Sequence, residues 1–223
     1  MTGSIDAVLF DLDDTLCRYR QSIGEVLSVA FERTGVDPVF DAADYVSRYD
    51  DYSEAADGID DLRRACFADL VSERGLDPAH GHALADAYAE ERDPTGVDPL
   101  PGAVDAVEAL ATDHRLAIVT NGALGMQADK LSALPFEDHF EHVVHAGYDA
   151  PAKPDPEPFH DVLDHLDTTP DRAVHVGNSL ETDVRGAHAA GVRSVWLADG
   201  STPDPTPTYT VEELSELTAP PWR

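Results

Sequence analysis

The sequence predicts an α/β fold, in which a doubly wound, Rossmann-like parallel sheet carries an inserted domain made only of helices. Three observations lead to this prediction. Apolar runs of strand length occur at residues 7–10 and again between residues 116 and 211, and segments of helical periodicity alternate with the later runs. Residues 17–97 show helical periodicity alone. Because such alternation implies a parallel sheet covered on both faces, we expect residues 1–16 and 98–223 to form the core and residues 17–97 the insert.

The first strand is predicted at residues 7–10, directly before the insert. The first helix of the insert has apolar residues at i, i+3, i+4, i+7 and i+8 from Ile23, and it ends near Gly35. Two further helical faces follow, one formed by Leu62, Cys66 and Leu70 and a weaker one by Leu84 and Tyr88.

The second half of the chain supplies the remaining elements of the core. Strands are expected at 116–119, 143–144, 173–176 and 194–197, with a short edge strand at 209–211 after a proline-rich loop. Helices are expected at 102–112, from Pro158 through Leu166, and between the strands at 173–176 and 194–197, ending at Gly191.

The composition excludes several classes of partner. Acidic residues outnumber basic ones by 44 to 15, which gives a formal net charge of −29 at pH 7. Without a basic stripe to neutralise phosphates, nucleic acid is disfavoured as a partner. The acids are spread along the whole chain, a pattern that resembles proteins of salt-loving organisms. We expect molar salt to stabilise the fold, because it screens the repulsion between these charges.

The sequence also indicates in which cellular compartment the protein is expected. No apolar stretch approaches the roughly 20 residues of a membrane span, and no basic region followed by a hydrophobic segment begins the chain. Cys17 and Cys66 lack metal-binding spacing, and we expect both to be free thiols. These features predict a soluble cytoplasmic protein without a membrane partner, and they leave its oligomeric state open.

Two carboxylates stand two residues apart directly after the first predicted strand. Asp11 and Asp13 occupy the place where ligands bind in doubly wound sheets, just beyond the carboxyl end of a strand. Alternate residues of an extended segment share a face, so both carboxylates can address one ligand while Leu12 packs on the other side. A chain with so many acids also produces Asp-x-Asp by chance, and it is the position, with the following Thr15, that favours a functional role.

Two later strands end in residues suited to a phosphate. Thr120, Asn121 and Gly122 follow the strand at 116–119 and offer a hydroxyl and backbone N–H groups, although this sequence is also a common turn. Lys153, one of only two lysines, lies in a loop stiffened by prolines on both sides. It is either an exposed lysine or a rigidly held charge for a phosphate or an aspartyl intermediate.

The strand at 173–176 is followed by candidate oxygen ligands. Asn178, Glu181 and Asp183 supply an amide and two acids that can complete a magnesium site. Asp183 is equally suited to cap the helix that follows. His175, inside the strand, is expected to be a packed core residue.

These four signals, in this order and each at a strand end, resemble the motifs of the haloacid dehalogenase superfamily. The family order is Asp-x-Asp-x-Thr, then Ser or Thr, then Lys, then an acidic Gly-Asp-x-x-x-x-Asp loop, with a helical cap between the first two motifs. The insert at 17–97 occupies the cap position. Thr-Asn-Gly followed by Gln127 and Lys130, and the segment 153–159, resemble the branch that contains phosphoglycolate phosphatase, pyrimidine nucleotidases and N-acylneuraminate-9-phosphatase.

This resemblance implies a Mg²⁺-dependent phosphomonoester hydrolase that acts on small phosphorylated metabolites. It implies that Asp11 attacks phosphorus to form an aspartyl phosphate, and that Asp13 acts first as general acid and then as general base. The residues implied to bind the phosphoryl group are Thr120, Asn121, Gly122 and Lys153. Those implied to bind Mg²⁺ are Asp11, Asp13 through its main-chain carbonyl, Asn178 and Asp183.

Two residues qualify the resemblance. Asp13 argues against a true dehalogenase, because a halide leaves without needing a proton. Asn178 stands where the family has an acid, and its amide oxygen can bind magnesium but brings no charge. The alternatives are a phosphomutase with the same aspartyl chemistry, a receiver-like signalling switch, and a phosphate-binding protein without turnover.

Overall fold

The first predicted strand is the centre of a parallel sheet. β1 (Ala7–Phe10) is buried along its whole length and pairs with β4 on one side and β6 on the other. The strand order is β5-β4-β1-β6-β7-β8, and neighbours are parallel throughout. The remaining strands are β4 (Arg115–Asn121), β5 (Phe140–Ala146), β6 (Ala173–Gly177), β7 (Arg193–Leu197) and β8 (Tyr209–Val211). The predicted doubly wound sheet, with residues 209–211 at its edge, is confirmed.

This computed structural model describes residues 4–53, 56, 58–122 and 124–223. The chain forms two units, one made of the residues up to Arg18 with Val97–Arg223 and the other of Tyr19–Gly96. The connections between them include β2 (Cys17–Tyr19) and β3 (Val97–Pro99), which pair with each other. The prediction of helices alone from residue 17 onward is wrong for these two segments, because a three-residue strand is too short to show a period of two.

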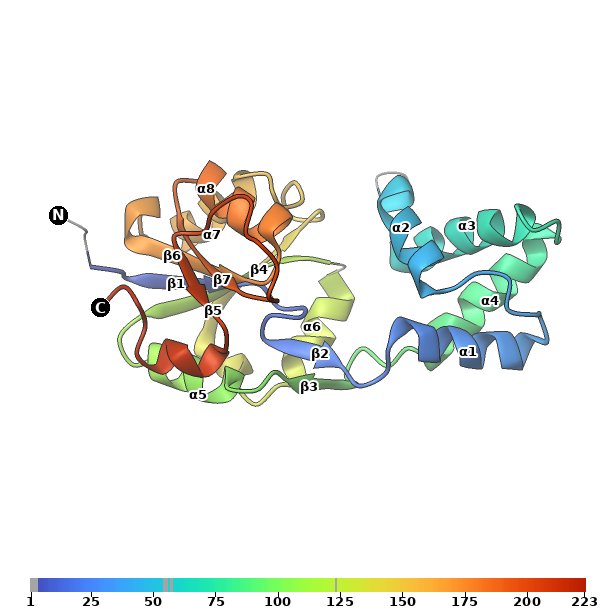
Figure 1. Cartoon of the computed structure of the whole chain (residues 1–223), viewed down its shortest axis with the longest axis horizontal. Coiled ribbons are helices and arrows are strands. Elements are labelled where there is room, and N and C mark those ends of the chain that lie inside the picture. Colours follow the sequence, from blue (N-terminus) through green and yellow to red (C-terminus); the bar gives the residue numbers. More distant parts are fainter. Residues whose placement is uncertain (1–3, 54–55, 57, 123) are drawn as a thin grey trace. The chain divides into compact units, whose positions relative to one another are not determined.

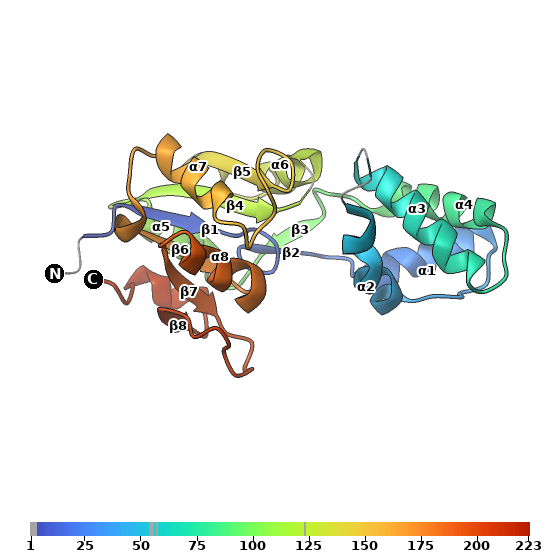
Figure 2. The ribbon, with the colours of Figure 1, turned by 90° about the horizontal axis from the view of Figure 1, so that it is seen from above.

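Helices cover both faces of the sheet. The core helices are α5 (Ala103–Leu110), α6 (Leu124–Ser132), α7 (Glu157–His165) and α8 (Arg185–Ala189), with short 3₁₀ segments at Glu137–His139, Pro170–Arg172 and Leu214–Thr218 and a π-helical turn at Leu180–Val184. Apolar residues of α7 and α8 pack with Leu9, Ala117 and Val119 of the sheet. Figure 1 shows α7 and α8 on one side of the strands and α5 on the other, and Figure 2 gives the view from above.

Two elements of the core differ from the prediction. β4 continues through Thr120 and Asn121, which therefore belong to the strand and not to a loop after it. The periodicity did not predict α6. Its buried positions include Gln127 and Lys130 beside Leu131, so polar residues occupy the inner face where an apolar stripe would normally mark a helix.

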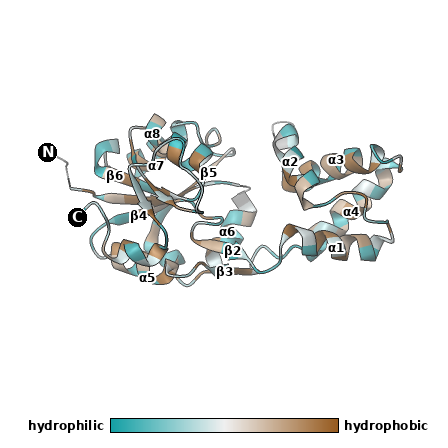
Figure 3. Ribbon diagram, in the orientation of Figure 1, coloured by the Kyte–Doolittle hydropathy of each residue, from teal (hydrophilic) through white to brown (hydrophobic). Residues whose placement is uncertain are grey.

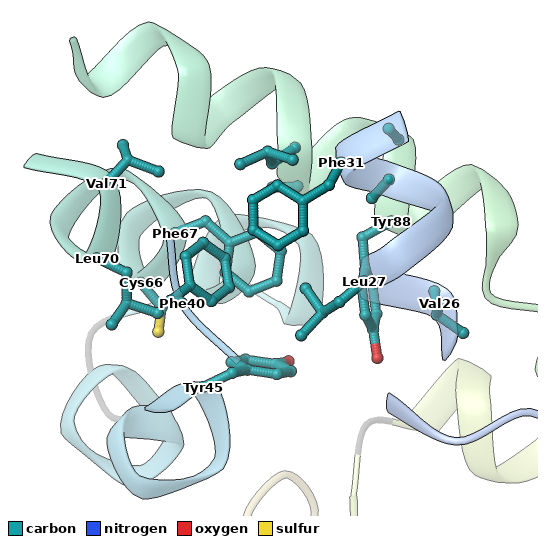
Figure 4. Close-up of a cluster of buried hydrophobic side chains, with 14 of the residues drawn as sticks. Val26, Leu27, Phe31, Phe40, Tyr45, Cys66, Phe67, Leu70, Val71 and Tyr88 are labelled. Carbon is teal, nitrogen blue, oxygen red and sulfur yellow. The ribbon is translucent and has the colours of Figure 1, made fainter. Parts of the chain in front are cut away.

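The described residues of the insert form four helices around an aromatic cluster. These are α1 (Ile23–Thr34), α2 (Ala42–Ser53), α3 (Ile59–Ser72) and α4 (Pro78–Glu91). α1 begins at a capping box between Ser22 and Glu25 and ends at Gly35, whose φ of +69° suits glycine. The rings of Phe31, Phe40, Tyr45, Phe67 and Tyr88 form the centre of the cluster (Figure 4).

The sequence pattern did not predict α2, whose residues are mostly polar and which contributes Tyr45 to the aromatic cluster. The helices of both units carry hydrophobic and hydrophilic residues side by side along their length (Figure 3). Within the described part of the chain, no helix combines the length and the apolar character needed to cross a membrane.

Candidate active site

Three ionisable residues from separate strand ends meet in the interior. Asp11 follows β1, Lys153 lies in the loop after β5, and Asp183 lies in the π-helical turn after β6. Lys153 Nζ is 2.8 Å from Asp11 Oδ1 and 2.7 Å from Asp183 Oδ1, and it also donates to the carbonyl oxygen of Val119 at 2.7 Å. Only 7% of Asp11, 3% of Lys153 and 2% of Asp183 is exposed. Lys153 is therefore a buried ion between two carboxylates and not an exposed lysine.

Thr15 joins the first motif to the loop after β6. Its hydroxyl oxygen lies 3.1 Å from Asp11 Oδ2 and 3.1 Å from Asn178 Oδ1, so its proton can serve either acceptor. The backbone N–H of Asn178 donates to the same hydroxyl oxygen at 3.2 Å. Thr15 thus holds Asn178 and the second oxygen of Asp11 next to one another, although the two residues are far apart in the sequence.

Asp183 is held from several directions. Its Oδ2 accepts the backbone N–H of Ser179 at 3.0 Å, while His175 Nε2 lies 3.0 Å from its Oδ1. The cap of the following turn is Ser179, whose side chain accepts from the backbone N–H of Thr182. A Cβ at Gly177 would collide with the Asp183 carboxyl group, so glycine is needed there for the close approach.

His175 is buried, as expected, but it is more than a packing residue. It packs edge-on against Phe159 with ring centroids 4.9 Å apart, and its Nδ1 has no hydrogen-bond partner among the described residues. Its Nε2 therefore carries the proton and donates to Asp183. Burial lowers the pKa of His175 despite the neighbouring carboxylate, which keeps the ring neutral.

The side chain of Asn121 contacts the loop that carries the lysine. Its Oδ1 accepts the backbone N–H of Lys153 at 2.8 Å, and its Nδ2 donates to the carbonyl oxygen of Lys153 at 3.0 Å. Both hydrogen bonds go to backbone atoms. The amide group therefore fixes the position of the lysine loop relative to β4.

Asp13 is held by two residues of α6. Lys130 Nζ lies 2.7 Å from each of its carboxylate oxygens, and Gln127 Nε2 donates to Oδ2 at 2.8 Å. Gln127 Nε2 also lies 2.8 Å from the hydroxyl oxygen of Thr120. The sequence reasoning gave no role to Gln127 or Lys130. The available signal was the family similarity at these two positions and the rarity of lysine.

The buried charges shift one another's pKa values. Burial raises the pKa of Asp11, an effect that Lys153 opposes and Asp183 reinforces. Burial also acts to raise the pKa of Asp183, but the charge of Lys153 and the hydrogen bond from His175 outweigh it, and the net shift is downward. Burial acts to lower the pKa of Lys153, yet the two carboxylates outweigh it and raise that pKa. Lys153 and Asp183 therefore form a charged pair at neutral pH.

The donor set suits magnesium. No cluster of three or more His, Cys, Asp or Glu side chains among the described residues is placed to hold a metal ion. The candidate ligands are two carboxylates, those of Asp11 and Asp183, with the amide oxygen of Asn178 and the main-chain carbonyl of Asp13. All are hard oxygen donors, and Mg²⁺ binds through one or two carboxylates while water and substrate phosphate complete its shell.

A family model described as haloacid dehalogenase-like hydrolase matches residues 5–191. The chain belongs to this family. The predictions of a haloacid dehalogenase-like hydrolase, and of an enzyme, are thereby confirmed.

Several known proteins are similar to this chain over long stretches. Phosphoserine phosphatase of Thermus thermophilus is 34% identical over 159 residues, which are 70% of this chain and 64% of that protein. Pyrimidine 5'-nucleotidase YjjG of Escherichia coli is 28% identical over 221 residues, 95% of this chain and 96% of that protein. The crystal structure of the putative HAD-hydrolase YfnB of Bacillus subtilis, bound to magnesium, matches with a TM-score of 0.76 and 24% identity over 97% of this chain and 98% of that one.

Proposed function

We propose that the protein hydrolyses phosphomonoesters of small metabolites through an aspartyl phosphate on Asp11. The observation that carries the proposal is the buried pair of Asp11 and Lys153, 2.8 Å apart at the carboxyl end of the central strand. A carboxylate nucleophile and a fixed cation at one point are what phosphoryl transfer to an enzyme requires. The names of two relatives, a phosphoserine phosphatase and a pyrimidine 5'-nucleotidase, support a small phosphate monoester as substrate.

Asp11 attacks phosphorus, and the ester oxygen leaves as the new Asp11–phosphate bond forms. Asp13 gives its proton to that oxygen and later takes a proton from the water that hydrolyses the intermediate, a role typically worth about 10²–10⁴-fold. The Asp13 side chain is 38% exposed, so a leaving group and a water molecule can reach it. Dividing one hydrolysis into two steps in this way lowers the highest barrier.

Thr120 and Lys153 bind the transferring phosphoryl oxygens. Gln127 donates to the Thr120 hydroxyl, so the hydroxyl proton itself is available for a phosphoryl oxygen. Lys153 brings a charge whose position two carboxylates and the carbonyl of Val119 define. The backbone N–H groups of Asn121 and Gly122 complete the phosphate site.

Magnesium would be held by Asp11, Asn178, Asp183 and the main-chain carbonyl of Asp13. When bound, it supplies positive charge that offsets the charge of the phosphoryl group. YfnB, a protein of the same fold, has been crystallised bound to magnesium. This support concerns the fold, and the assignment of ligands rests on the donor set of this chain.

We further propose that the enzyme works in the cytoplasm. Cys17 and Cys66 are free and buried. Burial raises the pKa of the Cys17 thiol to about 12 and that of the Cys66 thiol to about 11, so both thiols are unreactive. Free cysteines without a disulfide are typical of a reducing compartment, and this supports the proposal.

The test compares the wild type with Asp11→Asn. Phosphate release from p-nitrophenyl phosphate and from a panel of metabolite monophosphates is measured with Mg²⁺ in molar KCl. We expect turnover that is lost in Asp11→Asn and on addition of EDTA. Asp14→Asn is the matched control: it makes the same change three positions on, at an exposed residue whose φ is +56°, a conformation that asparagine tolerates.

A folded wild type without activity across the panel would contradict a phosphatase. Activity that requires a sugar bisphosphate would identify a phosphomutase instead. A phosphorylated protein that persists for minutes without turnover would favour a receiver-like switch.

A further inference from the structure

Helix α6 directs two buried polar side chains at the proposed acid–base residue. Lys130 bridges both carboxylate oxygens of Asp13 at 2.7 Å, and Gln127 reaches one of them at 2.8 Å. Lys130 is 4% exposed and Gln127 is 2% exposed. Their common target, the Asp13 side chain, is 38% exposed. The two donors are therefore enclosed by protein, while the acceptor faces solvent.

Stability alone does not explain this arrangement. A lysine or glutamine on the inner face of a helix costs free energy of desolvation, which an aliphatic residue would avoid. Gln127 Oε1 is buried without a hydrogen-bond partner among the described residues, which adds to the cost. Gly122 leaves room for this arrangement, because a Cβ there would displace the amide of Gln127 from its present position. Gln127 and Lys130 thus depart from the most stable choice in favour of contacts to Asp13.

We propose that Gln127 and Lys130 are positioning residues for proton transfer by Asp13. This inference rests on the proposed phosphatase function. Gln127 links Asp13 Oδ2 to the Thr120 hydroxyl, so it sets the distance between the acid–base carboxyl and the phosphoryl-binding group. Lys130 holds the carboxylate and stabilises the negative charge that remains on Asp13 after its proton has left.

The proton transfer can be followed atom by atom. The O–H bond of Asp13 breaks as its proton moves to the ester oxygen of the substrate, while the bond between that oxygen and phosphorus breaks. Phosphorus forms its new bond to the Asp11 carboxylate in the same step. The products are the aspartyl phosphate on Asp11, a neutral alcohol and the Asp13 carboxylate, which Lys130 and Gln127 then hold. An alkyl alkoxide needs this proton because it is a poor leaving group, whereas p-nitrophenolate leaves readily without it.

The inference therefore predicts a dependence on the leaving group. In Lys130→Met, kcat/KM for the best alkyl monophosphate of the panel should fall roughly tenfold to a hundredfold, a part of the 10²–10⁴-fold that general acid catalysis typically contributes. For p-nitrophenyl phosphate the change should stay below about threefold, because this step needs no acid. Gln127→Met should show the same selectivity with a smaller loss. Asp129→Asn, an exposed change on the same helix, is the control and should leave both substrates unaffected.

A double-mutant cycle distinguishes positioning from general damage. In Asp13→Asn no proton is left to position, so adding Lys130→Met should change the rate with the alkyl substrate little. An equal loss on both substrates, or an undiminished effect of Lys130→Met in the Asp13→Asn background, would overturn the inference. Thermal unfolding of each variant is measured in parallel, and Gln127→Met, which removes no charge, supplies the same readout if Lys130→Met does not fold.

The outcomes also separate the two proposals. A wild type that matches Asp11→Asn on every substrate would contradict the proposed function. An active wild type with a uniform loss in Lys130→Met and Gln127→Met would contradict the positioning role alone.

Discussion

The two units of the chain stabilise their interiors differently. In the core, Asp11, Lys153 and Asp183 are buried at the carboxyl edge of the sheet, where the lysine forms an ion pair with each of the two carboxylates. In the insert, the centre is a set of aromatic rings, and the buried guanidinium among the described residues, that of Arg63, lies 5.0 Å from the ring centroid of Tyr88. Apolar packing is not directional, whereas a buried charge depends on its partner. Removing a charge should therefore cost the most free energy of unfolding in the core, whereas removing an aromatic ring should cost the most in the insert.

The largest effect is expected for Lys153→Met. Removing this charge leaves Asp11 and Asp183 buried without their cation, and breaking such a pair typically costs about 3–5 kcal/mol. We expect a loss of that size in the free energy of unfolding from urea denaturation, together with loss of turnover. Arg64→Met in the insert is the matched control. It breaks an exposed pair with Asp86, with side chains 51% and 50% exposed, and should cost less than about 1 kcal/mol. Similar losses in the free energy of unfolding for Lys153→Met and Arg64→Met would contradict the proposed difference between a buried and an exposed ion pair.

A cavity in the insert tests the other half of the comparison. Phe67 is fully buried, and its ring centroid lies 5.0 Å from that of Phe40 and 5.0 Å from that of Tyr45. Phe67→Ala should cost about 3–5 kcal/mol. Hydrogen exchange should locate the loss of protection in α1–α4, with β1, β4 and β6 still protected. An equal loss of protection in the core strands would show that the two units do not unfold separately.

A smaller effect is expected at the metal ligands of the core. Asn178→Asp adds a charged oxygen donor, so Mg²⁺ should bind at least several-fold more tightly, and Asn178→Ala should weaken binding. Tryptophan fluorescence can follow the titration, because Trp196 Nε1 donates to the carbonyl oxygen of Asn178 at 2.9 Å. Equilibrium dialysis provides an independent measurement. An identical titration in all three proteins would show that Asn178 is not a ligand.

The smallest effect concerns histidines of the core away from the site. His142 of β5 stacks on His165 of α7, with ring centroids 3.7 Å apart. Burial, with the charge of His165, lowers the pKa of His142 from 6.5. As the pH falls, the unfolded chain therefore binds this proton first, so the stabilising contribution is present above about pH 6.5 and is lost below it. The drop in melting temperature between about pH 8 and pH 5.5 should be smaller in His142→Gln than in the wild type. An equal drop in the melting temperature of the two proteins would contradict the lowered pKa of His142.

Apolar runs were sufficient to predict β1, β4, β6 and β7, because a buried parallel strand is apolar on both faces. The same logic failed for α6. Its inner face carries Gln127 and Lys130, which contact Asp13 of a distant motif, and a periodicity of apolar residues cannot register such contacts. It also failed for α2, whose contribution to the aromatic cluster includes Tyr45.

The sequence by itself determined the α/β class, the helical insert and the family, because each depends on local patterns of residues and on motifs in order along the chain. Only the tertiary structure decided which polar groups pair. Lys153 meets Asp11 across 142 residues and Asp183 across 30, Gln127 meets Asp13 across 114, and Asn121 turns to the backbone of Lys153. These side chains are buried and hydrogen-bonded to one another only after the strands have come to lie side by side. Local sequence patterns therefore identify the polar residues, whereas the tertiary structure determines which of them form pairs.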